Sequence, residues 1–360
     1  MAKVSAPRVL IASESFSLER GGAARVGRLM ARYAVAERWN ANLVALGDAA
    51  PVKDFDLPSQ TAAGSRARFA FACWAGARTA THFVYNHPGI ARAHPRVPIL
   101  RRPYVVWLLG MDAWGDRMDG DYGRAAAAAD RLISISEFTR RRAAERLPKV
   151  AGAEVCWLAT EEDELPSQRP GRTGPPTVLI LSRIDRSEMQ KGHIELIEAW
   201  PAIRAAVPDA RLVIAGGGDG LDLVRRLAEA SSASASISCT DWVSQSAVAE
   251  LWARAHVLAM PSRQEGFGLV YAEAMRHGVP VIASVHDAGQ EINAHGVTGY
   301  NVDLDRRGDL AEHLVALLKD QDLMRRMGAA GQARWREHFC QSAFQRRLGP
   351  ILAGFLRAKD

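Results

Sequence analysis

The stretch Arg263-Gln-Glu-Gly-Phe-Gly-Leu-Val-Tyr-Ala-Glu-Ala-Met275 decides what this 360-residue chain can be. It follows an apolar segment, residues 256–260, and leads into a helical pattern that begins near Gly268. The two glycines of the stretch permit a close approach of the backbone, and the free N–H groups at a helix start suit an anion. Two carboxylates, Glu265 and Glu273, flank this turn. The stretch therefore predicts a site for a ligand with an anionic middle and hydroxyl-rich ends, such as a nucleotide sugar.

Short apolar segments alternate with longer helical patterns on both sides of this stretch. Segments such as 178–181 are continuously apolar, which is typical of parallel strands covered on both faces. The alternation predicts doubly wound α/β sheets. In the first half the expected strands are 8–12, 42–46, 82–85, 104–109, 131–135 and 154–158. In the second half they are 177–182, 211–215, 236–239, 256–260 and 279–283.

Residues 161–177 interrupt this rhythm with four consecutive acids followed by four prolines. That composition is unsuited to a packed element, so it predicts a linker between two α/β domains. The expected domains are residues 1–165 and 172–340. Because ligands bind beyond the carboxyl ends of parallel strands, we expect the chemistry in the loops that follow the strands, at a cleft between the domains.

The charge of the chain is unevenly distributed. Lys and Arg number 46 against 40 Asp and Glu, a net charge of +6. Residues 1–170 hold 24 bases and 18 acids, which accounts for the whole excess, and the rest hold 22 of each. Residues 61–110 carry seven arginines and no acid. This window predicts an anionic partner, which could be a nucleic acid, a phospholipid surface or a phosphate-bearing substrate, unless the arginines are simply scattered over the surface.

The four cysteines are far apart and form no Cys-x-x-Cys pair. This spacing argues against a disulfide framework, a zinc ribbon and a redox motif, and it favours a reducing compartment. The sequence predicts neither a secretory signal nor a membrane span. We therefore expect a cytoplasmic protein, with peripheral attachment to the inner face of the cytoplasmic membrane as a further option.

The segment 263–275 resembles the E-x7-E motif of the retaining GT-B glycosyltransferases of family 4, also called glycosyl transferases group 1. Glu265 and Glu273 have the spacing of that motif. Upstream, Arg183 and Lys191 are similar to the Arg and Lys pair with which the family holds the donor diphosphate.

The resemblance extends over residues 177–335, and it includes 213–219, which are similar to the family's second strand and turn. It implies the GT-B fold, in which two Rossmann-like, doubly wound parallel-sheet domains face an interdomain cleft. The first domain would bind the acceptor and the second the nucleotide-sugar donor. In this fold the last helix, here 341–360, is expected to cross back to the first domain.

The resemblance also implies roles for individual residues. Arg183, Lys191 and Glu265 would form the catalytic set, in which the two cations neutralise the departing diphosphate and the carboxylate binds hydroxyls of the donor sugar. Preorganised cations stabilise charge that develops on a leaving group, and Arg suits the bidentate part of that task. Glu273 would bind the ribose diol. The other donor-binding residues would be Gly21, Gly22, Gly266, Phe267, Gly268 and Leu269.

One family feature is altered in this chain. After the strand 104–109 the family usually has His-Gly-x-Asp/Glu, whereas this chain has Leu109-Gly110-Met111-Asp112. Asp112 and His87 are the acceptor-side candidates, with a loop cap and a structural histidine as the alternative interpretations. The missing imidazole leaves open a degenerate subunit that binds a nucleotide sugar without transferring it.

The predicted function is transfer of a hexose, with retained configuration, from a nucleoside-diphosphate sugar to a glycan or lipid-linked saccharide in cell-envelope polysaccharide synthesis. The alternatives are the degenerate subunit or a synthase or phosphorylase on the same fold. We expect a UDP- or GDP-linked donor and no cofactor. The resemblance implies no bound metal, and the pairs Asp303/Asp305 and Asp119/Asp121, which do not lie near the proposed site in the sequence, look like solvated carboxylates. An anionic membrane surface is the expected partner of residues 61–110, and nucleic acid is not expected to bind.

Overall fold

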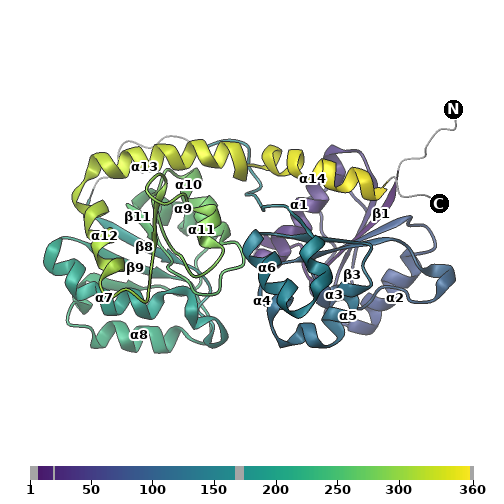
Figure 1. Ribbon diagram of the computed structural model, residues 1–360, viewed down its shortest axis with the longest axis horizontal. Helices are drawn as coiled ribbons and strands as arrows, with labels where there is room; N and C mark the ends of the chain where they lie inside the picture. Colours follow the sequence, from purple (N-terminus) through teal and green to yellow (C-terminus); the bar gives the residue numbers. More distant parts are fainter. Residues whose placement is uncertain (1–6, 19–20, 167–173, 357–360) are drawn as a thin grey trace. The chain divides into compact units, whose positions relative to one another are not determined.

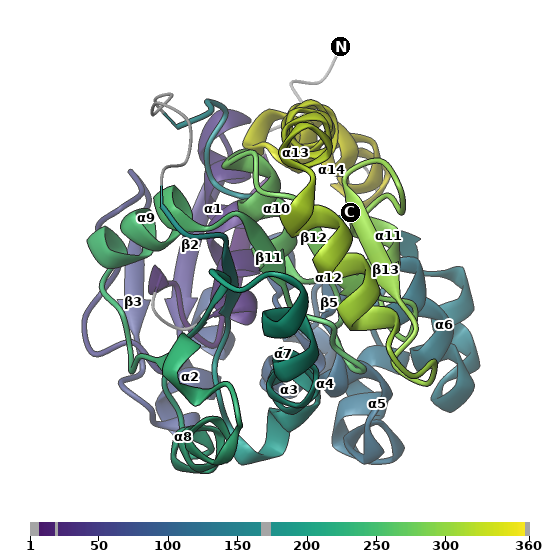
Figure 2. The same cartoon turned by 90° about the vertical axis from the view of Figure 1, so that its left-hand side faces the viewer.

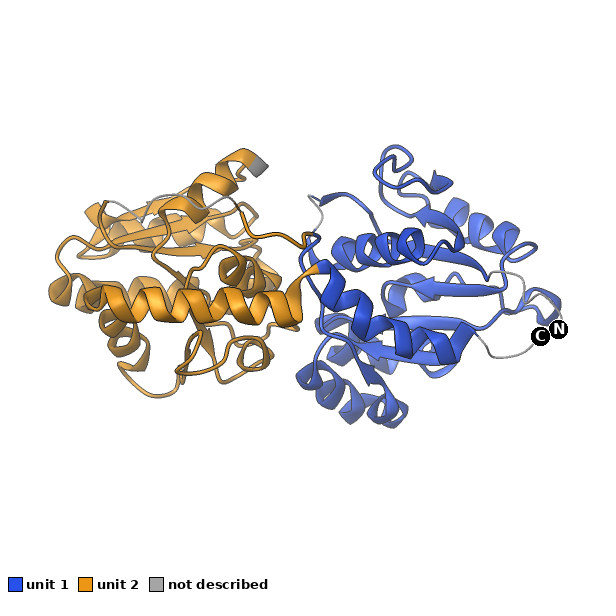
Figure 3. Ribbon diagram, turned by 90° about the horizontal axis from the view of Figure 1, so that it is seen from above, with its two compact units in different colours: residues 1–161, 341–360 blue, residues 162–340 orange. Residues whose placement is uncertain are grey.

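The structure is a computed structural model that describes residues 7–18, 21–166 and 174–356. The chain divides into two compact units (Figure 3). Unit 1 is Met1–Glu161 with Gln341–Asp360, and unit 2 is Glu162–Cys340. Residues 167–173 of the predicted linker and 357–360 of the predicted last helix lie outside the described residues.

Unit 1 contains a sheet of parallel strands in the order β3-β2-β1-β4-β5-β6-β7. The strands are β1 Arg8–Ser13, β2 Asn40–Ala45, β3 Ser59–Thr61, β4 His82–Tyr85, β5 Tyr104–Leu108, β6 Arg131–Ser134 and β7 Glu154–Val155. The helices are α1 Gly22–Ala36, α2 Arg66–Gly76, α3 Pro88–Ala91, α4 Met111–Trp114, α5 Asp121–Ala127, α6 Glu137–Arg146 and α14 Gln341–Leu356. Helices α1 and α14 lie on one side of this sheet, and α2 and α3 lie on the other (Figure 1).

Unit 2 repeats the plan with parallel strands in the order β10-β9-β8-β11-β12-β13. The strands are β8 Thr177–Leu181, β9 Arg211–Ala215, β10 Ile237–Cys239, β11 Val257–Ala259, β12 Val281–Ser284 and β13 Gly299–Val302. The helices are α7 His193–Ala206, α8 Leu221–Ala230, α9 Gln245–Arg254, α10 Leu269–Arg276, α11 Gly289–Ile292, α12 Asp309–Lys319 and α13 Gln321–Arg334. Helices α7 and α8 cover one side of the sheet, and α10 and α13 cover the other (Figures 1 and 2).

The predicted fold class, two doubly wound parallel sheets, is confirmed. Each strand expected from the sequence is present, with ends that differ by up to three residues. Two strands were not expected, β3 and β13, and both are edge strands. Their sequences, Ser-Gln-Thr and Gly-Tyr-Asn-Val, lack the continuous apolar character of a strand buried on both faces, because an edge position does not require it.

Helix α14 packs on the sheet of unit 1 although it follows unit 2 in the chain. Phe344 stacks on Trp107 of β5 with ring centroids 6.1 Å apart, and Phe355 meets His82 of β4 edge to face. The guanidinium of Arg131 donates a hydrogen bond to the carbonyl of Ile351. No helix in the described ranges has both the length and the apolar character needed to cross a membrane.

Both sheets reverse their strand order beside the first strand of the unit, between β1 and β4 and between β8 and β11. A crevice opens at such a switch point beyond the carboxyl ends of the strands, and it is the usual ligand site of doubly wound sheets. The loops that follow β1, β4, β8 and β11 are therefore the ones to search for function.

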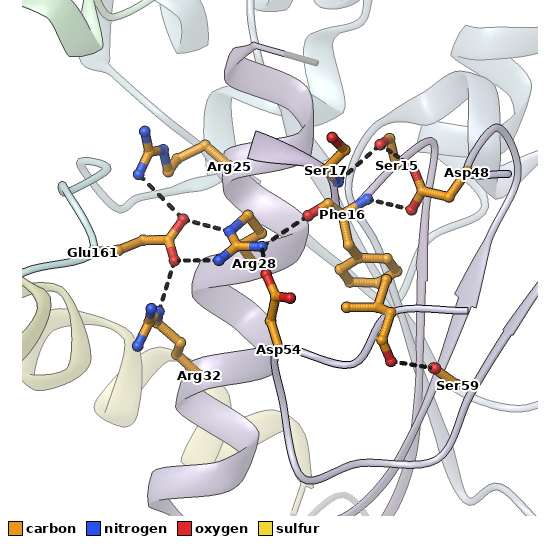
Figure 4. Close-up of polar contacts among 11 residues, drawn as sticks. Ser15, Phe16, Ser17, Arg25, Arg28, Arg32, Asp48, Asp54, Ser59 and Glu161 are labelled. Carbon is orange, nitrogen blue, oxygen red and sulfur yellow. Dashed lines mark hydrogen bonds and ion pairs between the residues drawn. The ribbon is translucent and has the colours of Figure 1, made fainter. Parts of the chain in front are cut away.

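The boundary of unit 1 is fixed by a buried ion cluster (Figure 4). The carboxylate of Glu161 accepts hydrogen bonds from Arg25, Arg28 and Arg32, which lie on successive turns of α1. Arg28 also pairs with Asp54 at 2.6 Å and donates to the carbonyl of Phe16. The side chains of Arg28 and Glu161 are only 4% and 6% exposed. Glu161 is thus a packed residue of unit 1. It lies within the predicted first domain, 1–165, but the expectation that residues 161–177 are unsuited to packing is wrong at this position.

Replacing Glu161 by Ala should lower the free energy of unfolding by about 3 kcal/mol, because it leaves Arg28 buried with part of its charge uncompensated. Burial would raise the pKa of Glu161, but its arginines outweigh burial and lower it. The stabilisation is therefore present above the ordinary pKa of a glutamate and is lost as the pH falls through the lowered value. Urea unfolding at neutral and acid pH measures both effects.

The control is Glu162→Ala at the next position, whose side chain is half exposed and lies 3.5 Å from Arg276. It should cost less than about 1 kcal/mol. Equal losses of unfolding free energy in the two variants would show that the buried cluster stabilises the protein no more than an exposed ion pair does.

Candidate functional site

Two cations lie beyond the carboxyl end of β8, joined by one carboxylate. Arg183 lies two residues after the strand, and Lys191 ends the short helical turn η5, Arg186–Lys191. The carboxylate of Glu188 accepts from Arg183 at 2.7 Å and pairs with the ammonium of Lys191 at 2.9 Å. Burial would raise the pKa of Glu188, but Lys191 and Arg183 outweigh it and lower the pKa. The sequence analysis missed Glu188, whose one signal was its position three residues before Lys191.

The loop after β11 is hydrogen-bonded to the backbone beside Lys191. The backbone N–H of Arg263 donates to the carbonyl of Gln190 at 2.9 Å. Gly192, with a φ of +94°, lies against Pro261, and a Cβ at Gly192 would come within 2.7 Å of that ring. The segment that carries Lys191 and the loop that carries Glu265 are therefore neighbours at the switch point of unit 2.

His193, at the start of α7, is a buried structural partner of the same edge. Its Nε2 lies 3.0 Å from the hydroxyl of Ser182. Burial, reinforced by the charge of Lys191, lowers the pKa of His193 to about 4. The imidazole is therefore neutral at physiological pH. Behind it, Gly216 has a φ of +139° and approaches the carbonyl of Ser182 so closely that a Cβ would overlap it.

The predicted turn into α10 is present, with Gly268 as the N-cap at a φ of +84°. A Cβ at Gly268 would collide with the ring of Tyr271, whose hydroxyl donates to the carbonyl of Met260 at 2.7 Å. Phe267 is buried. These contacts explain why the chain turns here, and they present the partly exposed side chain of Glu265 beside the helix start.

Three further predicted donor-binding residues belong to this turn or to the helix that follows it. Gly266 is buried immediately after Glu265, and Leu269 is the first residue of α10. Glu273 lies one turn into that helix, with a partly buried side chain. Unit 2 therefore carries these residues in the loops after β8 and β11 and in the start of α10: Arg183, Lys191, Glu265, Gly266, Phe267, Gly268, Leu269 and Glu273.

Asp287, which the sequence analysis did not identify, fixes the position of Glu265. It lies after β12 and is fully buried. Its carboxylate accepts the backbone N–H of Glu265 and that of Gly289, each at 2.8 Å. Burial, reinforced by the charge of Glu265, raises the pKa of Asp287 to about 7, although the hydrogen bonds from these two N–H groups oppose the shift.

Gly21 and Gly22 belong to unit 1, in the loop between β1 and α1. Gly21 is the N-cap of α1 with a φ of +75°, and Gly22 is its first residue. Both are exposed, and a Cβ on either would meet nothing within 4 Å. The donor-binding residues predicted from the sequence thus divide between the two units.

The two acceptor-side candidates follow β4 and β5, which are neighbours in the sheet. His87 caps α3, since its Nδ1 accepts the N–H of Gly89, and its Nε2 lies 3.7 Å from a carboxylate oxygen of Glu14. Asp112 lies in the first turn of α4, where burial raises the pKa of its carboxyl against the opposing effect of His87. Among the described residues, neither Asp112 Oδ2 nor His87 Nε2 has a hydrogen-bond partner.

The carboxylates considered as metal ligands are engaged by other groups. Asp119 pairs with Arg146, and Asp121 with Arg124. Asp303 and Asp305 gather with His286 so that one ligand atom from each lies within 4.8 Å of the others. However, Asp305 accepts from Arg263, and His286 Nε2 accepts the N–H of Leu304. Contrary to its separation in the sequence, this pair therefore lies near the loop of Glu265.

Comparison with known proteins identifies relatives of the chain. The family described as glycosyl transferases group 1 matches residues 161–334. A GDP-mannose-dependent alpha-(1-6)-phosphatidylinositol monomannoside mannosyltransferase of Mycobacterium tuberculosis is 34% identical over 257 residues, 66% of this chain and 64% of the relative. A GDP-mannose-dependent monoacylated alpha-(1-6)-phosphatidylinositol monomannoside mannosyltransferase of Corynebacterium glutamicum is 32% identical over 62% of each chain. The chain thus spans somewhat less than two thirds of the length of these relatives.

Solved structures agree on the fold. The HepE protein of Anabaena, in complex with UDP and glucose, superposes with a TM-score of 0.78 at 19% identity, over 97% of this chain and 100% of that one. Sucrose-phosphate synthase of Thermosynechococcus elongatus gives 0.75 at 18% identity, over 98% and 100%. These likenesses identify the two sheets as the GT-B glycosyltransferase fold. Residues 161–334 of the chain thus match the glycosyl transferases group 1 family, and relatives that share this part of the chain are named mannosyltransferases.

Proposed function

We propose that this protein is a retaining glycosyltransferase that moves a hexose from a nucleoside-diphosphate sugar to a hydroxyl of a lipid-linked saccharide or glycan, in cell-envelope polysaccharide synthesis. The observation that carries the proposal is the cation pair Arg183 and Lys191, held by Glu188 beside the loop of Glu265. Two cations and a helix start at a switch point suit a diphosphate, and a carboxylate beside them suits sugar hydroxyls.

The proposed donor is GDP-mannose. This choice rests on the names of the mycobacterial and corynebacterial relatives. UDP-glucose, which the Anabaena protein binds in a structure of the same fold, is the competing donor to be tested.

The proposed acceptor is a phosphatidylinositol-type mannolipid, again from the names of those relatives. His87 and Asp112 would contact the acceptor, because they follow adjacent strands of unit 1 and each has an atom without a hydrogen-bond partner among the described residues. Such an acceptor lies in a membrane, so an anionic membrane surface is the proposed partner of residues 61–110.

In the proposed mechanism the acceptor hydroxyl attacks from the face that the diphosphate leaves. Attack on that face retains the configuration of the sugar. Because the leaving oxygen takes the proton of the attacking hydroxyl, no separate base is needed. Arg183 and Lys191 offset the charge that develops on the diphosphate. Glu265 holds the sugar hydroxyls and Glu273 the ribose diol. No metal ion is part of this proposal, because the two cations already supply positive charge.

A second candidate function is a subunit that binds the nucleotide sugar without transferring it. Leu109 favours it, because this residue stands directly before Gly110 and Asp112 where the family usually has His. Turnover measurements separate the two functions.

Glu265→Ala and Lys191→Ala should each lower turnover by roughly 10²–10³, the scale expected when one charged transition-state contact is lost. Release of nucleoside diphosphate with a mannolipid acceptor measures this change. The controls Glu250→Ala and Lys319→Ala remove one exposed charge of each kind from α9 and α12, and they should leave turnover unchanged.

A chelator should also leave wild-type turnover unchanged. Near-normal rates in both site variants would defeat the assignment. Binding without turnover in the wild-type protein would favour the subunit that does not transfer.

The proposed donor should raise the thermal midpoint of the protein. A nucleotide at about 100 times its dissociation constant stabilises the folded state by about 2.7 kcal/mol. Differential scanning fluorimetry with GDP, UDP, ADP and their sugars measures the shift. We expect the largest shift with GDP or GDP-mannose and a smaller one in Lys191→Ala. A shift with UDP alone would overturn the choice of donor but not of the site.

Asp287→Asn should change how stability depends on pH. Because burial raises the pKa of Asp287 to about 7, the wild-type folded state binds more protons than the unfolded chain between about pH 4 and 7, and stability falls as the pH rises through that window. The Asn variant does not titrate there. It should be less stable than the wild type at acid pH, since Asn cannot accept both N–H groups, and the difference should shrink toward pH 7.

Thermal midpoints across this pH range measure the effect. A difference that is independent of pH would contradict it.

A further inference from the structure

The cation pair of unit 2 is matched by an equal number of carboxylates. Glu188 pairs with Arg183 at 2.7 Å and with Lys191 at 2.9 Å, and Arg183 also lies 3.6 Å from a carboxylate oxygen of Asp185. Cations alone would hold a multiply charged anion more tightly, because each carboxylate repels the ligand. The carboxylates at this edge therefore have a function other than a high affinity for anions.

Glu188 is a fixed part of this edge. It lies in η5, and two contacts hold η5 against the glycine-rich turn after β9. The backbone N–H of Arg186 donates to a carboxylate oxygen of Asp219 at 2.7 Å. A Cβ at Gly220 would come within 2.9 Å of the sulfur of Met189. Because the backbone is held on both sides of Glu188, its carboxylate is kept beside the two cations.

The carboxylate of Glu188 is ionised at neutral pH. Burial would raise its pKa, but the charges of Lys191 and Arg183 outweigh burial and lower it. The side chains of Glu188 and Lys191 are partly buried, so dissolved salt screens their interaction with a neighbouring anion less than it screens exposed charges. An anion bound to the two cations would therefore lie next to one negative charge of the protein.

We propose that Glu188 determines which phosphate compound the site accepts, by favouring a nucleotide sugar over nucleotides that end in a free phosphate. The proposal rests on the proposed function, because it takes a nucleoside-diphosphate sugar as the donor. It adds the residue that separates this donor from other nucleotides.

The charges of the competing ligands give the physical reason. A diphosphate esterified at both ends carries about two negative charges. A terminal phosphate loses its second proton with a pKa of about 6, so at neutral pH a free nucleoside diphosphate carries nearly three charges and a triphosphate nearly four. Each added charge adds one repulsion from Glu188. The carboxylate therefore weakens binding of the nucleotide sugar least.

The same repulsion acts on the product of the proposed transfer. That product is the free nucleoside diphosphate, which carries more charge than the donor from which it is formed. Glu188 therefore lowers the affinity for the product relative to the donor, and this difference favours release of the product after each transfer.

Binding of GDP-mannose, GDP and GTP to the wild type and to Glu188→Gln tests the proposal. Isothermal titration calorimetry in a buffer without divalent cations gives the dissociation constants. In the Gln variant the affinity for GDP relative to GDP-mannose should rise roughly fivefold, and that for GTP relative to GDP-mannose should rise further. Displaced cations would change all three affinities by one factor. Unchanged ratios would therefore overturn the proposal.

Two further variants separate the charge of Glu188 from its other properties. Glu188→Asp keeps the charge and should keep the affinity ratios of the wild type. Glu198→Gln removes one exposed carboxylate from α7 of the same unit and should also leave the ratios unchanged. An equal rise of the ratios in Glu198→Gln would assign the effect to the charge of the whole unit and overturn the proposal.

Product inhibition gives a second readout in turnover measurements. In Glu188→Gln the inhibition constant of GDP, relative to the KM for GDP-mannose, should fall by roughly the same factor of five. A ratio equal to that of the wild type would contradict a role of Glu188 in product release.

Inorganic pyrophosphate and tripolyphosphate make the test independent of the base and the sugar. The Gln variant should favour tripolyphosphate over pyrophosphate more strongly than the wild type does, and a wild type that binds neither anion would overturn the proposal. A raised ratio in a protein that transfers no sugar would defeat the proposed function and leave the role of Glu188 standing. Sugar transfer with unchanged ratios in the Gln variant would do the reverse.

Discussion

The candidate site depends on a carboxylate that holds two cations side by side. Arg183 and Lys191 would repel each other in a partly buried edge, and Glu188 offsets that repulsion with one oxygen for each. The same arrangement keeps both cations in place before any anion binds, so little reorganisation is needed when one does. The rest of unit 2 serves this geometry, because the backbone bond from Arg263 to Gln190 brings the loop of Glu265 to the same edge.

Close backbone packing makes that edge rigid. Gly192 against Pro261 and Gly216 against Ser182 leave no room for a Cβ, and both glycines have positive φ values. Such contacts confine the loops after β8, β9 and β11 to one arrangement. Asp287 completes the support by holding the backbone of Glu265. The loop of Glu265 is therefore held on two sides, by the glycine contacts on one side and by Asp287 on the other.

The sequence predicted what local pattern controls. The central strands are continuously apolar because helices cover both of their faces. The turn before α10 was predictable because its glycines indicate a close approach of the backbone. The edge strands β3 and β13 escaped prediction because they need no such pattern. The residue assignments at the site stay predictions, although unit 2 gathers those that belong to it.

The features that escaped sequence analysis are long-range. Glu188 and Asp287 belong to no motif, and their roles depend on partners that the fold supplies. Glu161 was assigned to a linker from the composition of its neighbours in the sequence. Its burial depends instead on arginines of α1, which are far away in the sequence.

Glu161 and Glu162 have one further consequence as neighbours. The side chain of Glu161 is fastened to α1 of unit 1, and that of Glu162 pairs with Arg276 of α10 in unit 2, which also binds the carbonyl of Glu164. The chain therefore passes from unit 1 to unit 2 between two consecutive residues. The crossing is thus tied on its unit 1 side to α1, which begins at Gly22, and on its unit 2 side to α10, which carries Glu273.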